Sequence, residues 1–319
     1  MANCHDLFQD FHKEVSLDDK KKDFLIEARG AIREKIRNYF KKKDMACPGF
    51  YGQGSYTLGT IINPIDEEYD IDDGVYLQNL DSDKTKWETP ETVHRWIYDA
   101  VKGHTKENPI DKRTCVRVVY AGEYHVDLPI YCMHDDNPYL AEKGDAGWHI
   151  SDARAIVEWF QEEVQGGGEQ LQKMVKFFKA WADNKSKSGD LPKSIALTVL
   201  IVESYAKKDR DDSSFAATIK RISERLDDST EILNPVDENE KLSDNITDDA
   251  MENLKEKLLI LLENASDALK TQDKKEACKK WRTEFGERFS NCEKIKDGEE
   301  EASTFPKPAI LHDNARSAW

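Results

Sequence analysis

The 319-residue sequence lacks any apolar run that approaches the roughly 20 residues needed to span a bilayer. Its polar start, Met1–Asp6, also lacks the basic-then-apolar order of a signal peptide. Basic residues are in deficit, because 47 Lys and Arg face 63 Asp and Glu and leave a net charge of −16. Binding to a nucleic-acid backbone depends on a basic face. We therefore expect a soluble, cytoplasmic globular protein that needs neither a membrane nor a long nucleic acid.

Paired cysteine motifs are absent as well. The six cysteines are scattered with no Cys-x-x-Cys spacing: Cys4, Cys47, Cys115, Cys132, Cys278 and Cys292. A structural zinc site or a disulfide framework normally shows closer, regular spacing. We therefore expect neither of them, and small buried thiols on strands are an ordinary alternative.

Two aspartates fall in a segment that is otherwise typical of a β-strand. Asp70 and Asp72 flank Ile71 and lead directly into residues 75–77, although Asp is a poor strand former. Residues i and i+2 of a strand point to one face, so the two carboxylates would lie side by side and repel each other. A divalent cation would remove that repulsion. A solvated turn is the plainer alternative, and a calcium-binding loop is disfavoured because its register puts Tyr69 at a ligand position.

A third carboxylate has a similar setting. Residues 114–119 and 124–130 are rich in β-formers and are separated by a short turn that contains glycine, which predicts a hairpin. His125 and Asp127 then share one face of the second strand. Pro129 cannot donate to a sheet ladder, so we expect the strand to end there or to lie at an edge.

The order of these motifs matters more than any one of them. If the hairpin lies beside the first strand, Asp70, Asp72 and Asp127 converge on a site for two Mg²⁺ ions, which are hard cations that prefer oxygen ligands. Upstream, Gly54 would let the backbone approach a phosphate, and Ser55 at a helix start would offer its hydroxyl and free N–H groups. Alone, each motif is more often a turn, a helix cap or a core carboxylate. Together they predict a nucleotidyl-transfer site.

A second polar group falls in the later part of the chain. Lys176 and Lys179 lie at i and i+3 of a helix predicted over residues 169–183. Ser194 precedes the apolar run 195–202, at a predicted helix N-terminus where free N–H groups suit a phosphate. A solvated lysine pair and an ordinary helix cap remain the alternatives.

The pattern changes near residue 150. Residues 23–39 predict a long amphipathic helix, and a strand-rich block follows over about 50–131, interrupted by a helix at 89–102. Helical patterns dominate the remainder of the chain. This predicts an α+β protein with a strand-containing domain at 1–150 and a helical domain at 151–319.

Three segments resemble the signature blocks of the bacterial cGAS/DncV-like nucleotidyltransferases (CD-NTases). These segments are Gln-Gly-Ser-Tyr at 53–56, Tyr-Asp-Ile-Asp-Asp-Gly-Val-Tyr-Leu at 69–77, and His-Val-Asp-Leu-Pro-Ile-Tyr at 125–131. The resemblance extends from about Phe24 to Ala206. It implies a polymerase-β-like nucleotidyltransferase core, with a mixed sheet and a long N-terminal helix, followed by a helical bundle of the OAS/cGAS type.

The resemblance also implies roles for particular residues. Asp70, Asp72 and Asp127 would be catalytic and would bind two Mg²⁺ ions, with Mn²⁺ as a possible substitute. The expected nucleotide-binding residues are Gln53, Gly54, Ser55, Arg117, Lys176, Lys179 and Ser194. Arg117 would contact a nucleobase or a phosphate, and the plainer alternative is that it is a surface arginine on a strand.

The activity implied is synthesis of a cyclic di- or trinucleotide second messenger from NTPs, with ATP, GTP or both as substrates, in bacterial antiphage signalling. A separate effector protein would receive the product. The acidic composition departs from cGAS and OAS, which need long nucleic acid. Linear oligonucleotide synthesis, transfer of a nucleotide to a protein, and a non-catalytic nucleotide-binding scaffold remain alternatives, and the sequence leaves open the bases, linkage, ring size and oligomeric state.

Overall fold

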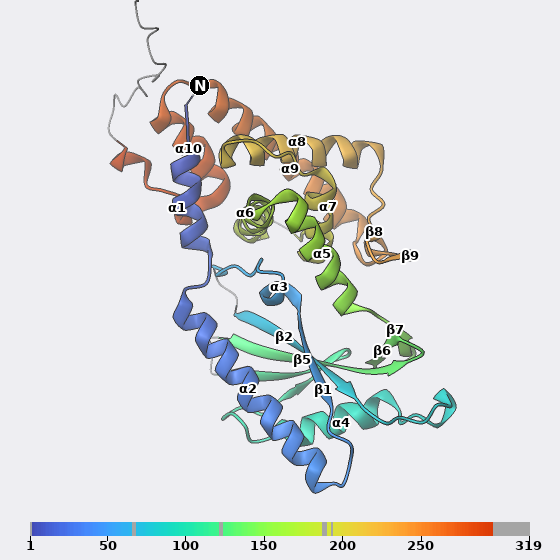
Figure 1. Ribbon diagram of the computed structural model, residues 1–319. Helices are drawn as coiled ribbons and strands as arrows, with labels where there is room; N and C mark the ends of the chain where they lie inside the picture. Colours follow the sequence, from blue (N-terminus) through green and yellow to red (C-terminus); the bar gives the residue numbers. More distant parts are fainter. Residues whose placement is uncertain (1, 66–67, 121–123, 187–189, 193, 296–319) are drawn as a thin grey trace, which may run out of the picture.

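A computed structural model describes residues 2–65, 68–120, 124–186, 190–192 and 194–295 (Figure 1). Its lower part in that view is a mixed sheet with two long helices, and its upper part is a helical bundle. The predicted α+β fold is confirmed. Among the described residues, no helix has both the length and the apolar character that a bilayer crossing requires.

The sheet has seven strands in the order β1-β2-β5-β4-β3, with β6 paired to β5 and β7 paired to β6. The β2–β5 pair is parallel and the other pairs are antiparallel. The strands are β1 Gly49–Gln53, β2 Tyr69–Leu77, β3 Ile110–Asp111, β4 Cys115–Tyr120, β5 Tyr124–His134, β6 Asn137–Glu142 and β7 Gly147–Ile150.

The predicted hairpin is confirmed, because β4 and β5 pair antiparallel; its turn, 121–123, lies outside the described residues. The prediction that this strand ends or lies at an edge at Pro129 was wrong. β5 continues to His134 as a central strand between β2 and β4. Its parallel ladder with β2 has no pair at Pro129 and resumes at Ile130, so the missing N–H falls in a gap of the ladder.

One face of the sheet is covered by α2 (Asp19–Lys42) and α4 (Pro90–Val101), and the sequence predicted a helix in both segments. The buried residues of α2 recur at helical spacing and form its apolar face: Leu25, Ala28, Ile32, Ile36 and Phe40. Alternate residues of β2, among them Ile71 and Val75, are fully buried in the same core. The residues between them therefore point to the opposite face, which the helical bundle overlies in Figure 1.

The helical half buries a separate aromatic core that includes Phe177, Trp181, Phe215, Trp281 and Phe285. A two-stranded sheet, β8 Leu233–Asn234 with β9 Asp237–Lys241, and several short 3₁₀ turns accompany it. The helices are α5 Ala153–Gly167, α6 Glu169–Lys185, α7 Ser194–Ser204, α8 Asp211–Asp228, α9 Asp248–Lys270 and α10 Lys274–Phe285.

The first helix, α1 (His5–Val15), belongs to this helical core although it begins the chain. Phe8 contacts the rings of Phe177, Phe215 and Trp281 at centroid distances of 5.1, 5.9 and 4.9 Å. The domain boundary near residue 150 stays a prediction. The packing adds that residues 2–15 complete the later half of the molecule.

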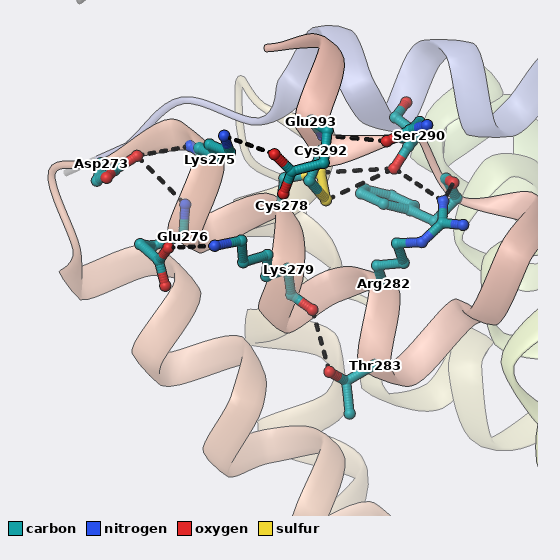
Figure 2. Close-up of a disulfide and its surroundings, with 12 residues drawn as sticks. Asp273, Lys275, Glu276, Cys278, Lys279, Arg282, Thr283, Ser290, Cys292 and Glu293 are labelled. Atoms are coloured by element: carbon teal, nitrogen blue, oxygen red, sulfur yellow. Dashed lines mark hydrogen bonds and ion pairs between the residues drawn. A yellow bond between two sulfur atoms is a disulfide. The ribbon is translucent and has the colours of Figure 1, made fainter. Parts of the chain in front are cut away.

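Cys278 of α10 and Cys292 form a disulfide, with their Cα atoms 5.6 Å apart (Figure 2). The expectation that the cysteines form no disulfide was therefore wrong for this pair. The two residues are 14 apart in the sequence, and the chain reverses through a 3₁₀ turn, Gly286–Arg288, to bring them together. The two cysteines meet because of how the chain folds back after α10, and their spacing in the sequence does not indicate the contact.

Candidate active site

The aspartates Asp70, Asp72 and Asp127 lie at neighbouring positions of β2 and β5. In the parallel ladder Asp72 pairs with Asp127, and Asp70 pairs with His125. One oxygen or nitrogen atom from each of Asp70, His125 and Asp127 lies within 4.8 Å of the others, which is close enough for one metal ion to touch all three. The structure thus brings two of the predicted carboxylates, Asp70 and Asp127, within reach of one ion together with His125, and it places Asp72 opposite Asp127 in the ladder.

The electrostatics of these carboxylates indicate a missing positive charge. Burial, Asp70 and Asp127 together raise the pKa of Asp72 from 3.8 to about 8. For Asp70, burial also raises the pKa, but the hydrogen bond and the charge of His125 outweigh it and the pKa is lowered. A divalent cation would offset the burial and the repulsion that together raise the pKa of Asp72. The donor set therefore fits an oxygen-preferring metal ion.

Gly54 allows Asp72 to approach the backbone closely. Gln53 ends β1 opposite Asp72, and the four-residue turn α3 (Gly54–Thr57) begins directly after it. Gly54 has φ +68°, and a Cβ atom placed there would lie 1.9 Å from Oδ2 of Asp72. Any larger residue would displace that carboxylate. The Gly-Ser pair is thus linked sterically to the aspartate pair.

A cavity of about 790 Å³ lies over these residues, between the sheet and the helical half. Its volume is within the range of small-molecule sites. Its walls include Leu58 to Ile62 from the sheet half and α6 and α7 from the helical half. Most of the predicted site residues line it: Gln53, Gly54, Ser55, Asp70, Asp72, Lys179 and Ser194.

Lys179 brings a positive charge to this cavity from α6. Its Nζ atom donates to the carbonyl oxygen of Thr60 at 3.2 Å. Burial lowers the pKa of Lys179 to about 8, while Asp70 and Asp72 act in the opposite direction. Ser194, the first residue of α7, lies on the same cavity wall with its side chain exposed.

Two predicted nucleotide-binding residues have other partners. Lys176 Nζ donates to Ser16 Oγ at 3.1 Å and does not line the cavity. Arg117 makes a bidentate pair with Asp127, with N–O distances of 2.6 and 2.7 Å, and Lys112 lies 3.8 Å from the same carboxylate. In this structure Arg117 therefore orients a carboxylate and contacts no part of the cavity wall.

Sequence reasoning assigned no role to His125 or Glu68. Nδ1 of His125 lies 3.3 Å from a Glu68 carboxylate oxygen, and Nε2 lies 3.6 Å from Oδ2 of Asp70. The strand alternation placed His125 on the face of Asp127, and that was the available signal. Asn234 and Glu240 of the β8–β9 hairpin also line the cavity, and no sequence pattern pointed to them.

Two protein families match the chain in the order of its two halves. Residues 48–131 match the nucleotidyltransferase domain of the cyclic GMP-AMP synthase DncV-like family, and residues 168–298 match the cyclic GMP-AMP synthase C-terminal domain. A cyclic GMP-AMP synthase of Escherichia albertii is 28% identical over 262 residues, which cover 76% of this chain and 58% of that protein. One from Vibrio cholerae is 27% identical over 309 residues, covering 78% of this chain and 69% of that protein.

A crystal structure of the Vibrio cholerae DncV cyclic AMP-GMP synthase, in complex with nonhydrolyzable GTP, has the same fold. Its TM-score to this protein is 0.78 at 24% identity, over 91% of this chain and 98% of that chain. In the sequence alignment, this chain spans a little over half the length of the Escherichia albertii relative. Both halves match in order, and the aspartates of the matching core converge beside a cavity, so this chain belongs to the bacterial cGAS/DncV-like nucleotidyltransferases.

Proposed function

We propose that this protein joins NTPs, with ATP and GTP as substrates, into a cyclic di- or trinucleotide and releases pyrophosphate. The observation that carries the proposal is the placement of Asp70, Asp72 and Asp127 on neighbouring strands, where Asp70, Asp72 and Lys179 line a cavity of about 790 Å³. The names of the relatives support the cyclic product and the purine substrates.

Asp70, Asp72 and Asp127 would hold two Mg²⁺ ions, or Mn²⁺ in their place. When bound, such ions stabilise the attacking and leaving oxygens of an in-line displacement at a phosphoryl group. Asp72, whose pKa is raised to about 8, would give up its proton on binding a cation.

The remaining site residues handle the triphosphate. Lys179 reaches the cavity from α6 and neutralises phosphate charge, while Ser55 and Ser194 line the same cavity and offer hydroxyl groups to phosphate oxygens. Gln53 lines the same cavity, and its Nε2 donates to the hydroxyl of Tyr131 at 3.1 Å, which orients the amide beside a bound nucleotide. After the first transfer the linear intermediate turns over in the cavity, and a second transfer closes the ring.

We place this reaction in bacterial antiphage signalling of the CBASS type, where a separate effector protein receives the cyclic product. Family membership supports this part of the proposal.

The test is incubation of the purified protein with Mg²⁺ or Mn²⁺ and labelled NTPs, singly and in mixtures, followed by phosphatase treatment and mass spectrometry. We expect a phosphatase-resistant product with the wild type and none with Asp70→Asn or Asp72→Asn. Label that stays phosphatase-sensitive with every metal would refute the proposal, and a product whose mass retains a terminal triphosphate would indicate linear oligonucleotides. Acid-precipitable label on protein would indicate nucleotide transfer to a protein, and a scaffold would keep its cellular role in the Asp70→Asn variant.

A further inference from the structure

The segment 58–65, called here the cleft wall, is held in place by the helical half. Gln172 donates to the carbonyl oxygen of Leu58 at 3.0 Å, and Lys179 donates to that of Thr60 at 3.2 Å. The backbone N–H of Ile65 donates to Asp183 at 3.2 Å. All three side chains belong to α6. Since the wall lines the cavity and precedes β2, its position relative to α6 governs the distance between Lys179 and the aspartates.

Arg288 reinforces this contact from a distant part of the chain. Its guanidinium donates to the carbonyl oxygen of Asn63 at 2.9 Å and to that of Ala180 at 2.8 Å. The same group pairs with Asp183 at 2.8 Å. Asn63 belongs to the cleft wall and Ala180 follows Lys179 on α6. The side chain is only 12% exposed, so these contacts are shielded from solvent.

The segment that carries Arg288 is itself fixed. Figure 2 shows Arg282 of α10 reaching the backbone at Ser290, and the Cys278–Cys292 disulfide closing the same segment. Phe289, next to Arg288, is 1% exposed and packs in the aromatic core. Arg288 therefore extends from an anchored turn to the cleft wall and α6. Its planar fork suits two carbonyls and a carboxylate in a way that a single ammonium does not.

We propose that Arg288 is a positioning residue, which sets the spacing between the cleft wall and α6 and so holds Lys179 at the distance from Asp70 and Asp72 that a bound triphosphate requires. The inference rests on the proposed function, because Lys179 is taken to contact the triphosphate. Arg288 itself contacts no reacting atom.

Arg282 offers a matched control. It also bonds backbone carbonyls of the segment after α10, those of Phe289 and Ser290, and it pairs with Glu287. None of its contacts among the described residues reaches the cleft wall or α6. If Arg288 only stabilises the C-terminal segment, Arg288→Gln and Arg282→Gln will have equal effects.

The kinetic test compares these two variants under conditions where circular dichroism shows both to be folded. We expect Arg288→Gln to lower kcat about 10- to 100-fold, since misplacing a group by about 1 Å costs on the order of 100-fold. Arg282→Gln should keep kcat within about twofold. In a Lys179→Met background, Arg288→Gln should add little, because residues that act through one another are non-additive. Equal losses in the two single variants, or additivity with Lys179→Met, would overturn the proposal.

Hydrogen exchange gives a readout that needs no activity. Arg288→Gln should speed amide exchange in residues 58–65, while Arg282→Gln should speed it only around 286–292. Unchanged exchange in 58–65 would refute the positioning role even in an active enzyme. A wild type that makes no nucleotide product would instead refute the proposed function. If Arg288→Gln does not fold, Arg288→Lys, which keeps the charge and loses the planar fork, carries the same expectations.

Discussion

Replacing Gly54 with alanine should separate catalysis from folding more sharply than any change to the aspartates. Gly54 has φ +68°, a conformation that disfavours any residue with a Cβ atom. The added Cβ would also lie 1.9 Å from Oδ2 of Asp72. The substitution therefore strains the backbone and pushes a proposed metal ligand out of place.

The two effects differ in size. A left-handed conformation costs a non-glycine residue about 1–2 kcal/mol, which most folded proteins tolerate. The Asp72 carboxylate would have to retreat from 1.9 Å to the 3.4 Å of ordinary contact, a shift of about 1.5 Å. Displacement of a catalytic group by about 1 Å costs on the order of 100-fold in rate. We expect Gly54→Ala to lose at least about 100-fold in pyrophosphate release with only a modest loss of stability.

Gly103 provides the control for backbone strain. It has φ +69°, and a Cβ atom placed there would meet nothing within 4 Å. Gly103→Ala should lower the free energy of unfolding by the backbone strain alone, about 1–2 kcal/mol, and leave the rate of product formation unchanged. Urea titration and initial-rate measurements on both variants check this. The reasoning fails if Gly54→Ala retains more than half of the wild-type rate, or if Gly103→Ala loses as much activity.

Three further predictions concern pH, the disulfide and a buried ion pair. The pKa of Asp72 is raised to about 8, and Asp72 must lose its proton to bind a cation. Metal affinity should therefore rise about tenfold per pH unit up to about pH 8. Calorimetry in buffers of different ionisation enthalpy should detect the released proton. Lys179, with its pKa lowered to about 8, loses its charge above that pH, so NTP affinity should fall there and activity should peak near pH 8. Reducing the Cys278–Cys292 bond should lower the free energy of unfolding by about 3 kcal/mol for this loop length. Urea titration with and without a dithiol reductant measures this loss. The stability of the variant with both cysteines replaced by serine should not change when the reductant is added. Arg33→Met should cost about 3–5 kcal/mol in the same titration because it leaves the fully buried Asp73 unpaired, whereas loss of an exposed pair would cost under about 1 kcal/mol.

The sequence predicted the features that depend on local periodicity. A strand period of two forces Asp70 and Asp72 onto one face, and it places His125 on the face of Asp127, so half of the site follows from spacing alone. The helical spacing of α2 likewise predicted most of its buried face, but Phe24, which the spacing also assigned to that face, is 54% exposed. The parallel neighbours β2 and β5 are joined by a long crossover, so their pairing came from the family resemblance and from the order of the motifs.

Features set by the tertiary path of the chain could not be predicted in this way. Arg288 meets Asn63 across 225 residues, and no sequence pattern relates them. The packing of α1 into the helical core depends on which surfaces meet after folding. The contact of Arg117 with Asp127 follows instead from the register of the predicted hairpin, in which the two residues are paired. The rule that proline avoids central strands also failed at Pro129, because the hydrogen-bond ladder between β2 and β5 has a gap there.

The placement of the cleft wall explains why distant residues can matter to chemistry here. Leu58 and Ile62 pack in the core of the helical half, while Ile61, between them in the sequence, packs in the core of the sheet half. The wall therefore joins two separate cores. The three aspartates belong to one half and Lys179 to the other, so the wall fixes the distance between opposite charges across the cavity. A close-packed wall cannot shift on one side without moving the other, and side chains that secure it, such as Arg288, can affect the reaction without touching a nucleotide.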